Sequence, residues 1–190
     1  YKLLRSEANR TLKEDNEAKV IREVGTGGAA NYAEYLGALP AKYYSQGSFP
    51  QIDDVSGAKM TETILVGRSA CQGCVIACGR VVKLPKDMAK RKGPEHETMV
   101  GFGANLLNAD LESIVDMGDL CDRYGMDTIS TSNTIGLAFH LYEKGIITKE
   151  DTDGIELKWG DVDAIERLVR MTGSREGFGD LLAQGSRRFG

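Results

Sequence analysis

Long apolar runs, an excess of basic charge and a dense set of cysteines are all absent from this sequence. No stretch approaches the ~18 consecutive apolar residues that can span a bilayer, so we expect no membrane span. The 28 acidic residues outnumber the 24 basic ones, and non-specific nucleic-acid binding depends on clustered Lys and Arg, so we expect no nucleic-acid partner. Four cysteines in 190 residues are too few for a disulfide scaffold.

The start of the chain and its glycine content are also informative. Charged residues follow Tyr1 directly and form no secretory signal, which favours a cytoplasmic location. The chain starts without Met and stops within a helical pattern at Gly190, so we expect a piece of a longer polypeptide. Glycine supplies 23 residues, so several backbone positions need its freedom or its small size. We divide the chain into an N-terminal segment and loop, 1–50, and a helical domain, 51–190.

Three of the four cysteines, Cys71, Cys74 and Cys78, lie within eight residues. Thiolates at spacings of three and four residues can converge on one small group, as they do in iron–sulfur clusters and zinc sites. Gly73 and Gly79 allow the tight backbone wrapping that a cluster needs. We therefore favour an iron–sulfur cluster held by these three cysteines.

The spacing alone leaves the fourth ligand and the metal open. A [4Fe-4S] cluster usually takes a fourth thiolate, from Cys121 or from a cysteine beyond Gly190. A zinc site completed by His96 is the second interpretation. The third is that the cysteines are small buried hydrophobic residues that bind no metal.

Hydrophobic periodicity predicts a mainly α fold, an irregular helical domain with glycine-rich loops. Capping residues and glycines predict one helix from Asp110 to Gly125 and another from Asp127 to Gly145. The remaining expected elements are a helix-favouring stretch at 5–20, a short strand at 19–24, helices at 31–36, 52–62, from 94, at 161–171 and from 177, and loops at 37–50 and 151–160.

The segment Gly25–Ala30 matches G-x-G-x-x-A after the expected strand, which raises the question of a dinucleotide site. No acidic residue follows at the usual distance of ~20 positions, and no further strand–helix alternation follows. We favour a turn that lets the backbone approach a neighbouring segment.

Five segments occur together in the order and at the spacing of a known family. They are Gly25–Gly28, Gly37–Pro40, the cysteine segment 71–78, Gly93–Thr98 and Asp122–Thr128. The set resembles the tungsten-containing aldehyde ferredoxin oxidoreductase family, and the resemblance covers nearly the whole chain. Each segment is a modest indication alone, but the ordered set is specific.

The resemblance implies the helical domains 2 and 3 of a longer enzyme, whose β-rich first domain lies outside this chain. Such enzymes hold tungsten between two pterins, with molybdenum as the alternative metal, beside a [4Fe-4S] cluster. They oxidise aldehydes to carboxylic acids and pass electrons to ferredoxin or another carrier. One branch reduces an aromatic thioester instead. The resemblance also implies a homo-oligomer or larger complex, and it predicts that the isolated segment is inactive.

The resemblance assigns roles to particular residues. The cysteines at 71, 74 and 78 match three cluster ligands, and the fourth lies in a second motif beyond Gly190. The first pterin-binding motif, D-x-x-G-L-D, matches Asp122, Gly125, Met126 and Asp127 and is followed by Thr128; methionine replaces the usual leucine. The carboxylates would accept hydrogen bonds from the pterin. Without the family, a surface acid at 122 and a helix cap at 127 are the simpler interpretation.

Glu97 matches the family's glutamate near the metal, in the sequence Gly93–Thr98. The resemblance implies that it takes a proton during oxidation. A simpler role for Glu95 and Glu97 is favourable charge at a helix N-terminus. Cys121 and His140 lie at helical spacing with apolar residues, so we expect core packing for both.

Overall fold

The computed structural model describes all 190 residues and shows a mainly helical fold, as the sequence predicts. Eleven α-helices and three 3₁₀ helices surround one small sheet. The first part contains α1 (Lys2–Glu14), α2 (Asn16–Val24), η1 (Thr26–Gly28), α3 (Ala29–Tyr35), α4 (Ala41–Tyr44), η2 (Pro50–Val55) and α5 (Gly57–Thr63). The sheet contains β1 (Leu65–Ser69), β2 (Gly79–Lys83) and β3 (Lys90–Lys92). The last part contains α6 (His96–Phe102), η3 (Ala104–Leu106), α7 (Leu111–Tyr124), α8 (Thr128–Glu143), α9 (Val162–Ser174), α10 (Phe178–Leu182) and α11 (Ser186–Phe189).

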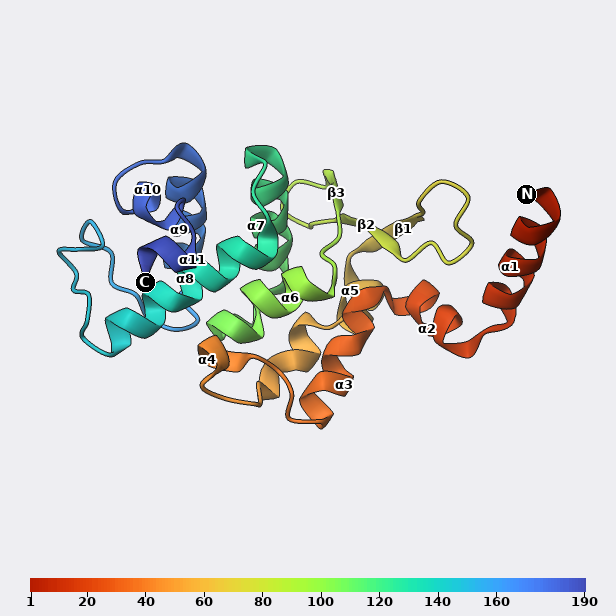
Figure 1. The fold of residues 1–190 in the computed structure, drawn as a ribbon, viewed down its shortest axis with the longest axis horizontal. Helices are drawn as coiled ribbons and strands as arrows, with labels where there is room; N and C mark the ends of the chain where they lie inside the picture. Colours follow the sequence, from red (N-terminus) through yellow and green to blue (C-terminus); the bar gives the residue numbers. More distant parts are fainter.

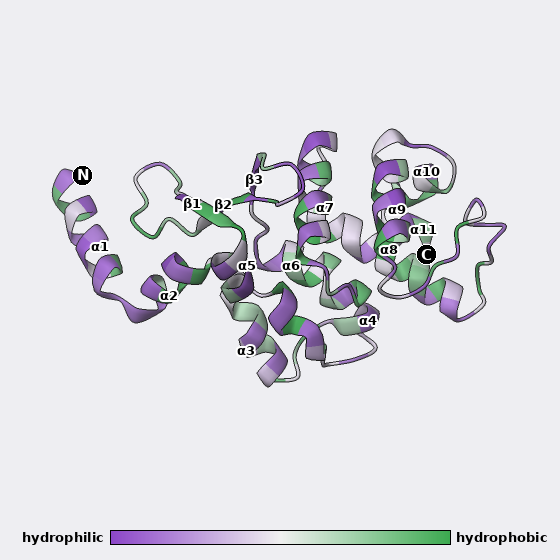
Figure 2. Ribbon diagram, turned by 180° about the vertical axis from the view of Figure 1, so that it is seen from behind, coloured by the Kyte–Doolittle hydropathy of each residue, from purple (hydrophilic) through white to green (hydrophobic).

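The molecule is elongated, with its two termini in opposite halves (Figure 1). Helices α7 to α11 form one half, and α1 projects at the far end of the other. A single hydrophobic core of 32 buried residues extends from Ala30 to Leu182. Helix α1 buries no residue, and its ribbon is largely hydrophilic in Figure 2. No helix combines the length and the apolar character needed to cross a bilayer.

Helices α7 and α8 begin and end where the capping residues predict. The Asp110 carboxylate accepts hydrogen bonds from the N–H groups of Glu112 and Ser113 at the start of α7. Gly125 ends that helix at φ +70°, in the left-handed region that favours glycine. The Asp127 carboxylate then caps α8 by accepting from the Ser130 N–H at 2.7 Å. The two helices therefore meet at a short turn, 125–127.

The expected strand at 19–24 is wrong, because these residues form the second half of α2. The Asp15 carboxylate caps this helix by accepting from the Ala18 N–H at 2.7 Å, and it splits the stretch 5–20 into two helices. The apolar residues Val20, Ile21 and Val24 have the i, i+1, i+4 spacing of a helix face. A similar break divides the helix expected at 52–62, where the Ser56 hydroxyl caps α5.

The sheet was not among the expected elements. Strand β2 is the middle strand and pairs antiparallel with both β1 and β3. Its side chains alternate between half-buried and buried positions over only five residues, which is too short a pattern for a firm prediction. The loop that joins β1 to β2 carries the three clustered cysteines, so the sheet determines where that loop leaves the body.

The glycine segment at 25–30 forms a turn against a neighbouring backbone. Because helix α2 precedes it, the strand that a dinucleotide fingerprint requires is absent. A Cβ atom on Gly57 would lie 2.4 Å from the Val24 carbonyl oxygen and 2.6 Å from the Gly28 nitrogen. Only glycine fits at this crossing of α5 and η1, so the close-approach prediction is confirmed.

Candidate functional site

The first turn of α6 is hydrogen-bonded to the glycine segment. The Thr26 hydroxyl donates to the Glu95 carboxylate at 2.6 Å, and the His96 N–H donates to the same hydroxyl oxygen at 2.9 Å. Thr26 therefore connects η1 with the start of α6, and Glu95 is occupied in this contact. Sequence reasoning missed this role, because the segment Gly25–Gly28 does not show which distant residue the Thr26 hydroxyl contacts.

Glu97 follows in the same turn, and its side chain is exposed. Together with His96 it borders two cavities, of about 690 and 250 Å³. The Nδ1 atom of His96 is buried and has no hydrogen-bond partner. The Glu97 carboxylate and the His96 ring thus border both cavities, and an exposed carboxylate there suits proton transfer to a bound molecule.

Apolar and polar side chains both line the larger cavity. Helix α2 supplies the apolar residues Val20 and Ile21, and α3 supplies Tyr32. The polar residues include Glu17, Thr26, His96 and Glu97. The smaller cavity is bordered by Tyr44 and Asn133, whose side chains are joined by a hydrogen bond of 3.0 Å. Few polar groups on an apolar surface are typical of a small-molecule site.

The predicted pterin motif occupies the turn between α7 and α8. Asp122 and Gly125 are exposed, and Met126 packs against the core. The Lys92 Nζ atom lies 3.5 Å from an oxygen of the Asp122 carboxylate. Hydrogen bonds from the Ser130 N–H and hydroxyl hold the pKa of Asp127 below its ordinary value. A cavity of about 350 Å³ opens beside Met126 and Asp127, lined further by Tyr124, Ser130, Thr131, Thr134 and Arg175.

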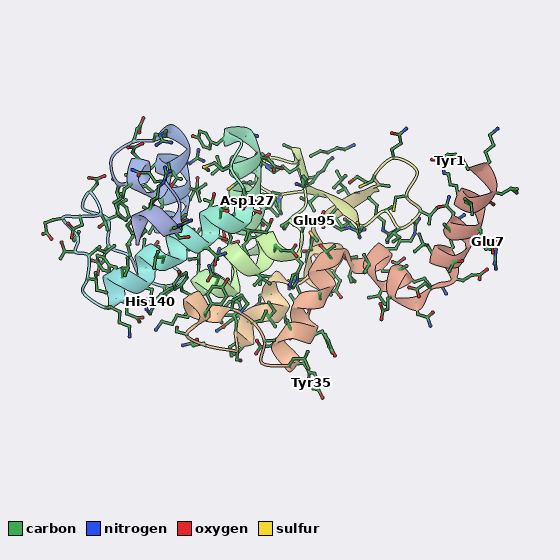
Figure 3. The ribbon with its side chains drawn as sticks, viewed as in Figure 1. Tyr1, Glu7, Tyr35, Glu95, Asp127 and His140 are labelled. Atoms are coloured by element: carbon green, nitrogen blue, oxygen red, sulfur yellow. The ribbon has the colours of Figure 1, made fainter.

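Helix α6 and the motif are in direct contact. The hydroxyl oxygens of Thr98 and Thr128 lie 2.9 Å apart in a hydrogen bond. Glu95, Thr98, Asp122 and Thr128 line one small recess between the two segments. Figure 3 shows Glu95 and Asp127 near the middle of the molecule, at the starts of α6 and α8. The structure thus brings the predicted catalytic segment and the predicted cofactor segment together.

The three clustered cysteines lie on the loop between β1 and β2. Cys71 is exposed, Cys74 and Cys78 are half-buried, and all three are free thiols. The Cys74 N–H donates to the Cys71 carbonyl at 3.0 Å and closes a tight turn. Three reachable thiols on one loop are a donor set that fits an iron–sulfur cluster.

The three cysteine side chains do not converge on a common point. No group of three or more His, Cys, Asp or Glu side chains is close enough to hold a metal ion. Cluster ligation by the three cysteines therefore stays a prediction. His96 lies instead beside Glu97 at the two cavities, so no zinc site that includes it is formed.

Two arginines hold the cysteine loop, and sequence reasoning missed both. Arg80, at the start of β2, is only 1% exposed, and burial lowers the pKa of its guanidinium. Its nitrogens donate to the carbonyls of Ala77 and Cys78. Arg22, on α2, donates to the carbonyls of Val75 and Ile76. A lone arginine after Cys-Gly gives no sequence pattern that would identify such a contact.

Cys121 directly precedes the pterin motif, and His140 lies further along α8. Cys121 is fully buried on α7, as predicted, and burial raises the pKa of its thiol to about 11. His140 is half-buried, and its ring lies 5.7 Å from that of Tyr43. Its Nδ1 atom is buried without a partner, so the packing prediction holds but the imidazole is not fully hydrogen-bonded.

The chain is thus a helical body that carries a cysteine loop and a glutamate-bearing helix beside a D-x-x-G-M-D turn. The family model for aldehyde ferredoxin oxidoreductase, domains 2 & 3, matches residues 3–190. The chain therefore belongs to the aldehyde ferredoxin oxidoreductase family.

Named relatives agree with this assignment. The chain is 36% identical over 187 residues to the tungsten-containing aldehyde ferredoxin oxidoreductase of Pyrococcus furiosus, covering 98% of this chain and 31% of the relative. The corresponding protein of Thermococcus kodakarensis is 34% identical over 188 residues, with the same coverage. The chain thus spans about a third of the length of these relatives.

Two further comparisons cover less of the chain. The aliphatic sulfonate oxidoreductase, WOR-like subunit, of Pyrococcus furiosus is 38% identical over 119 residues, 61% of this chain and 19% of that protein. The solved structure of the active site complex BamBC of benzoyl coenzyme A reductase superposes with a TM-score of 0.57 at 24% identity. It covers 72% of this chain and 20% of that one, and it supports the fold alone.

Proposed function

We propose that this chain is the cluster- and pterin-binding part of a tungsten, or molybdenum, bis-pterin oxidoreductase. The enzyme would oxidise aldehydes to carboxylic acids and pass the electrons through a [4Fe-4S] cluster to ferredoxin or another carrier. The observation that carries the proposal is the Thr98–Thr128 hydrogen bond of 2.9 Å, which joins the helix of Glu97 to the D-x-x-G-M-D turn. Relatives named as tungsten-containing oxidoreductases support it.

The turn 122–128 would hold the pterin. Its carboxylates, Asp122 and Asp127, can accept hydrogen bonds from the amine and ring N–H groups of a pterin. The lowered pKa of Asp127 keeps that carboxylate ionised at neutral pH, so it stays an acceptor. When bound, the metal–pterin centre and the cluster would supply the two-electron and one-electron chemistry, respectively.

Glu97 would hold and move the proton of the reaction. Glu97 is exposed and, with His96, lines both cavities in which a small substrate would lie. Val20, Ile21 and Tyr32, which line the larger cavity, would contact the apolar part of the substrate. A small aldehyde, apolar except for one carbonyl oxygen, matches such a cavity.

Metal and sulfide analysis of the full-length protein, purified without oxygen, tests the cofactor assignment. We expect about four iron and four sulfide per chain, together with tungsten or molybdenum. Zinc without iron would overturn the proposal, and iron without tungsten, molybdenum or pterin would indicate an electron-transfer module. Turnover is then measured with aldehydes, an aromatic acyl thioester and an aliphatic sulfonate. The last two are included because the similar proteins are named as a benzoyl coenzyme A reductase complex and an aliphatic sulfonate oxidoreductase.

The substitution Glu97→Gln tests the proton-transfer role. General acid–base catalysis contributes about 10²- to 10⁴-fold, so we expect a loss of that size in turnover with metal content unchanged. Glu62→Gln, at an exposed position of α5, is the matched control and should leave turnover at the wild-type level. Full activity of the Glu97 variant would remove this residue from the mechanism.

A further inference from the structure

Two arginines donate hydrogen bonds to a run of carbonyl groups at the end of the cysteine loop. Four successive carbonyls, from Val75 to Cys78, each accept a hydrogen bond from a guanidinium at 2.8 to 3.3 Å. Arg22 donates to the carbonyls of Val75 and Ile76, and Arg80 donates to those of Ala77 and Cys78. The stretch that ends at the third cysteine is thereby fixed along one side of its backbone.

Arg80 also ties this loop to α2. Its two terminal nitrogens donate to the carbonyls of Glu23 at 2.9 Å and Arg22 at 3.0 Å, at the end of that helix. The guanidinium thus satisfies the last carbonyls of α2 and the carbonyls of the loop together. Removing it would leave the partly buried carbonyls of Arg22, Ala77 and Cys78 without this donor.

The opposite side of the same stretch offers donors. None of the N–H groups of residues 75–78 donates to a protein acceptor. Ala77 has φ +54°, and successive N–H groups next to a left-handed residue form the concave nests that bind anions, including iron–sulfur clusters. With the carbonyls turned to the arginines, the free N–H groups and the thiols remain for a cluster.

The charge of Arg80 has no side-chain counterion. No carboxylate lies within ion-pair distance of its guanidinium, and the carboxylate of Glu23 pairs with Arg68 instead, at 2.9 Å. A buried cation without an anion is costly, unless an anionic group binds beside it. An iron–sulfur cluster with thiolate ligands is such a group, and the charges around it set its reduction potential.

We propose that Arg22 and Arg80 are positioning residues for the cluster, and that the buried charge of Arg80 raises the cluster's reduction potential. This inference rests on the proposed function. One-electron reduction adds one negative charge to the cluster and makes or breaks no bond. A fixed positive charge beside Cys78 stabilises the reduced form more than the oxidised form. Arg80 therefore favours electron uptake from the active site.

The test is a redox titration of the anaerobically purified full-length protein, followed by electron paramagnetic resonance, with iron release to a chelator as a second readout. Arg80→Gln removes the charge and most donors, and we expect a more negative midpoint potential and roughly tenfold faster iron release. Arg80→Lys keeps the charge, so we expect a near-wild-type potential with faster release. Arg22→Gln should accelerate release and shift the potential little.

Arg68→Gln is the matched control, because it removes an equal charge from β1, where the side chain is 33% exposed and is screened by solvent and by the paired Glu23 carboxylate. An Arg80→Gln potential no lower than that of Arg68→Gln would overturn the charge role. If both Arg80→Lys and Arg22→Gln release iron at the wild-type rate, the positioning role is wrong. These two variants still test that role if Arg80→Gln does not fold. If the purified wild-type protein contains no iron, the proposed function itself is wrong.

Discussion

At the scale of single residues, the four cysteines occupy two different environments. Cys71 is exposed on its loop, and Cys74 and Cys78 are half-buried beside it. Cys121 lies on α7 inside the core, among side chains such as Ile114. A thiolate ligand must reach its metal, and a buried thiol in apolar surroundings is inert. Burial therefore separates the three predicted ligands from Cys121, although all four look alike in the sequence.

Cys121 should make the stability of the chain sensitive to alkaline pH. Burial raises the pKa of this thiol from 9.0 to about 11, which favours the protonated form in the fold. This contribution is complete below pH 9 and is lost as the pH rises through about 11. A shift of this size corresponds to about 2–3 kcal/mol. We expect wild-type to lose more thermal stability between pH 8 and pH 10.5 than Cys121→Ala does.

The substitution Cys71→Ala is the control for that measurement. Its thiol is exposed, so its removal should leave the pH dependence of the melting temperature unchanged. If Cys121→Ala and wild-type lose stability in parallel above pH 9, the thiol at 121 does not titrate as its burial implies.

At the scale of elements, the start of α8 combines a helix cap with a predicted cofactor contact. The Asp127 carboxylate accepts the Ser130 N–H at 2.7 Å, and the same carboxylate is expected to bind the pterin. Asparagine caps a helix about as well as aspartate, whereas alanine costs about 0.5–2 kcal/mol. The two roles can therefore be separated by substitution.

We expect Asp127→Asn to keep the melting temperature and to lower the pterin content, and Asp127→Ala to lower both. Fluorescence of the released pterin and calorimetry measure the two quantities. Because the pKa of Asp127 is lowered in the fold, its ionised cap is complete at neutral pH and is lost as the pH falls through that lowered value. Unchanged pterin content in both variants would leave Asp127 as a cap only.

The crossing of α5 with η1 should be intolerant of a single methyl group. The Cβ atom of Gly57→Ala would lie 2.4 to 2.7 Å from three backbone atoms, which cannot move independently. We expect a loss of about 3 kcal/mol or more in the free energy of unfolding, measured by denaturant titration.

Gly118→Ala is the matched substitution for this comparison. Its Cβ would meet only the Thr98 methyl group, at 3.4 Å, inside helix α7. Alanine is favoured over glycine by about 1 kcal/mol in a helix interior, so this variant should be neutral or more stable. Equal effects of the two substitutions would show that the crossing is not tightly packed.

The elements that the sequence predicts well are those defined by their ends. Helices α7 and α8 carry an aspartate cap at the start, and α7 stops at Gly125, so local chemistry alone determines their bounds. Segment 19–24 has apolar residues that suit a strand or a helix, and only the Asp15 cap decides between them. The sheet depends on pairing across the cysteine loop. Such non-local contacts leave little trace in a short sequence window.

At the scale of the whole molecule, the candidate site is assembled from segments that are distant in sequence. Thr26 contacts Glu95 across 69 positions, Arg80 contacts Glu23 across 57, and Thr98 contacts Thr128 across 30. The resemblance identified three of these regions by their motifs, but the threonine and arginine contacts between them required the structure. Thr26, Thr98 and Thr128 lie inside the motifs and Arg80 lies outside them, so residues of both kinds hold the segments in place.

The chain by itself offers a cluster three reachable thiols. Cys121 is enclosed in the core, so it cannot supply the fourth without unfolding α7. A [4Fe-4S] cluster usually takes four thiolates, and the family resemblance places the fourth outside this segment. The chain also spans only 31% of its full-length relatives.

We therefore expect residues 1–190, expressed alone and reconstituted with iron and sulfide without oxygen, to hold a cluster that a chelator strips within minutes. An added small thiol can act as the missing ligand and should slow that loss, whereas Cys121→Ser should not change it. The segment should oxidise no aldehyde. Four irons that resist the chelator without added thiol would mean that the chain completes the site from its own residues. The fourth ligand would then have to be sought among its oxygen and nitrogen donors.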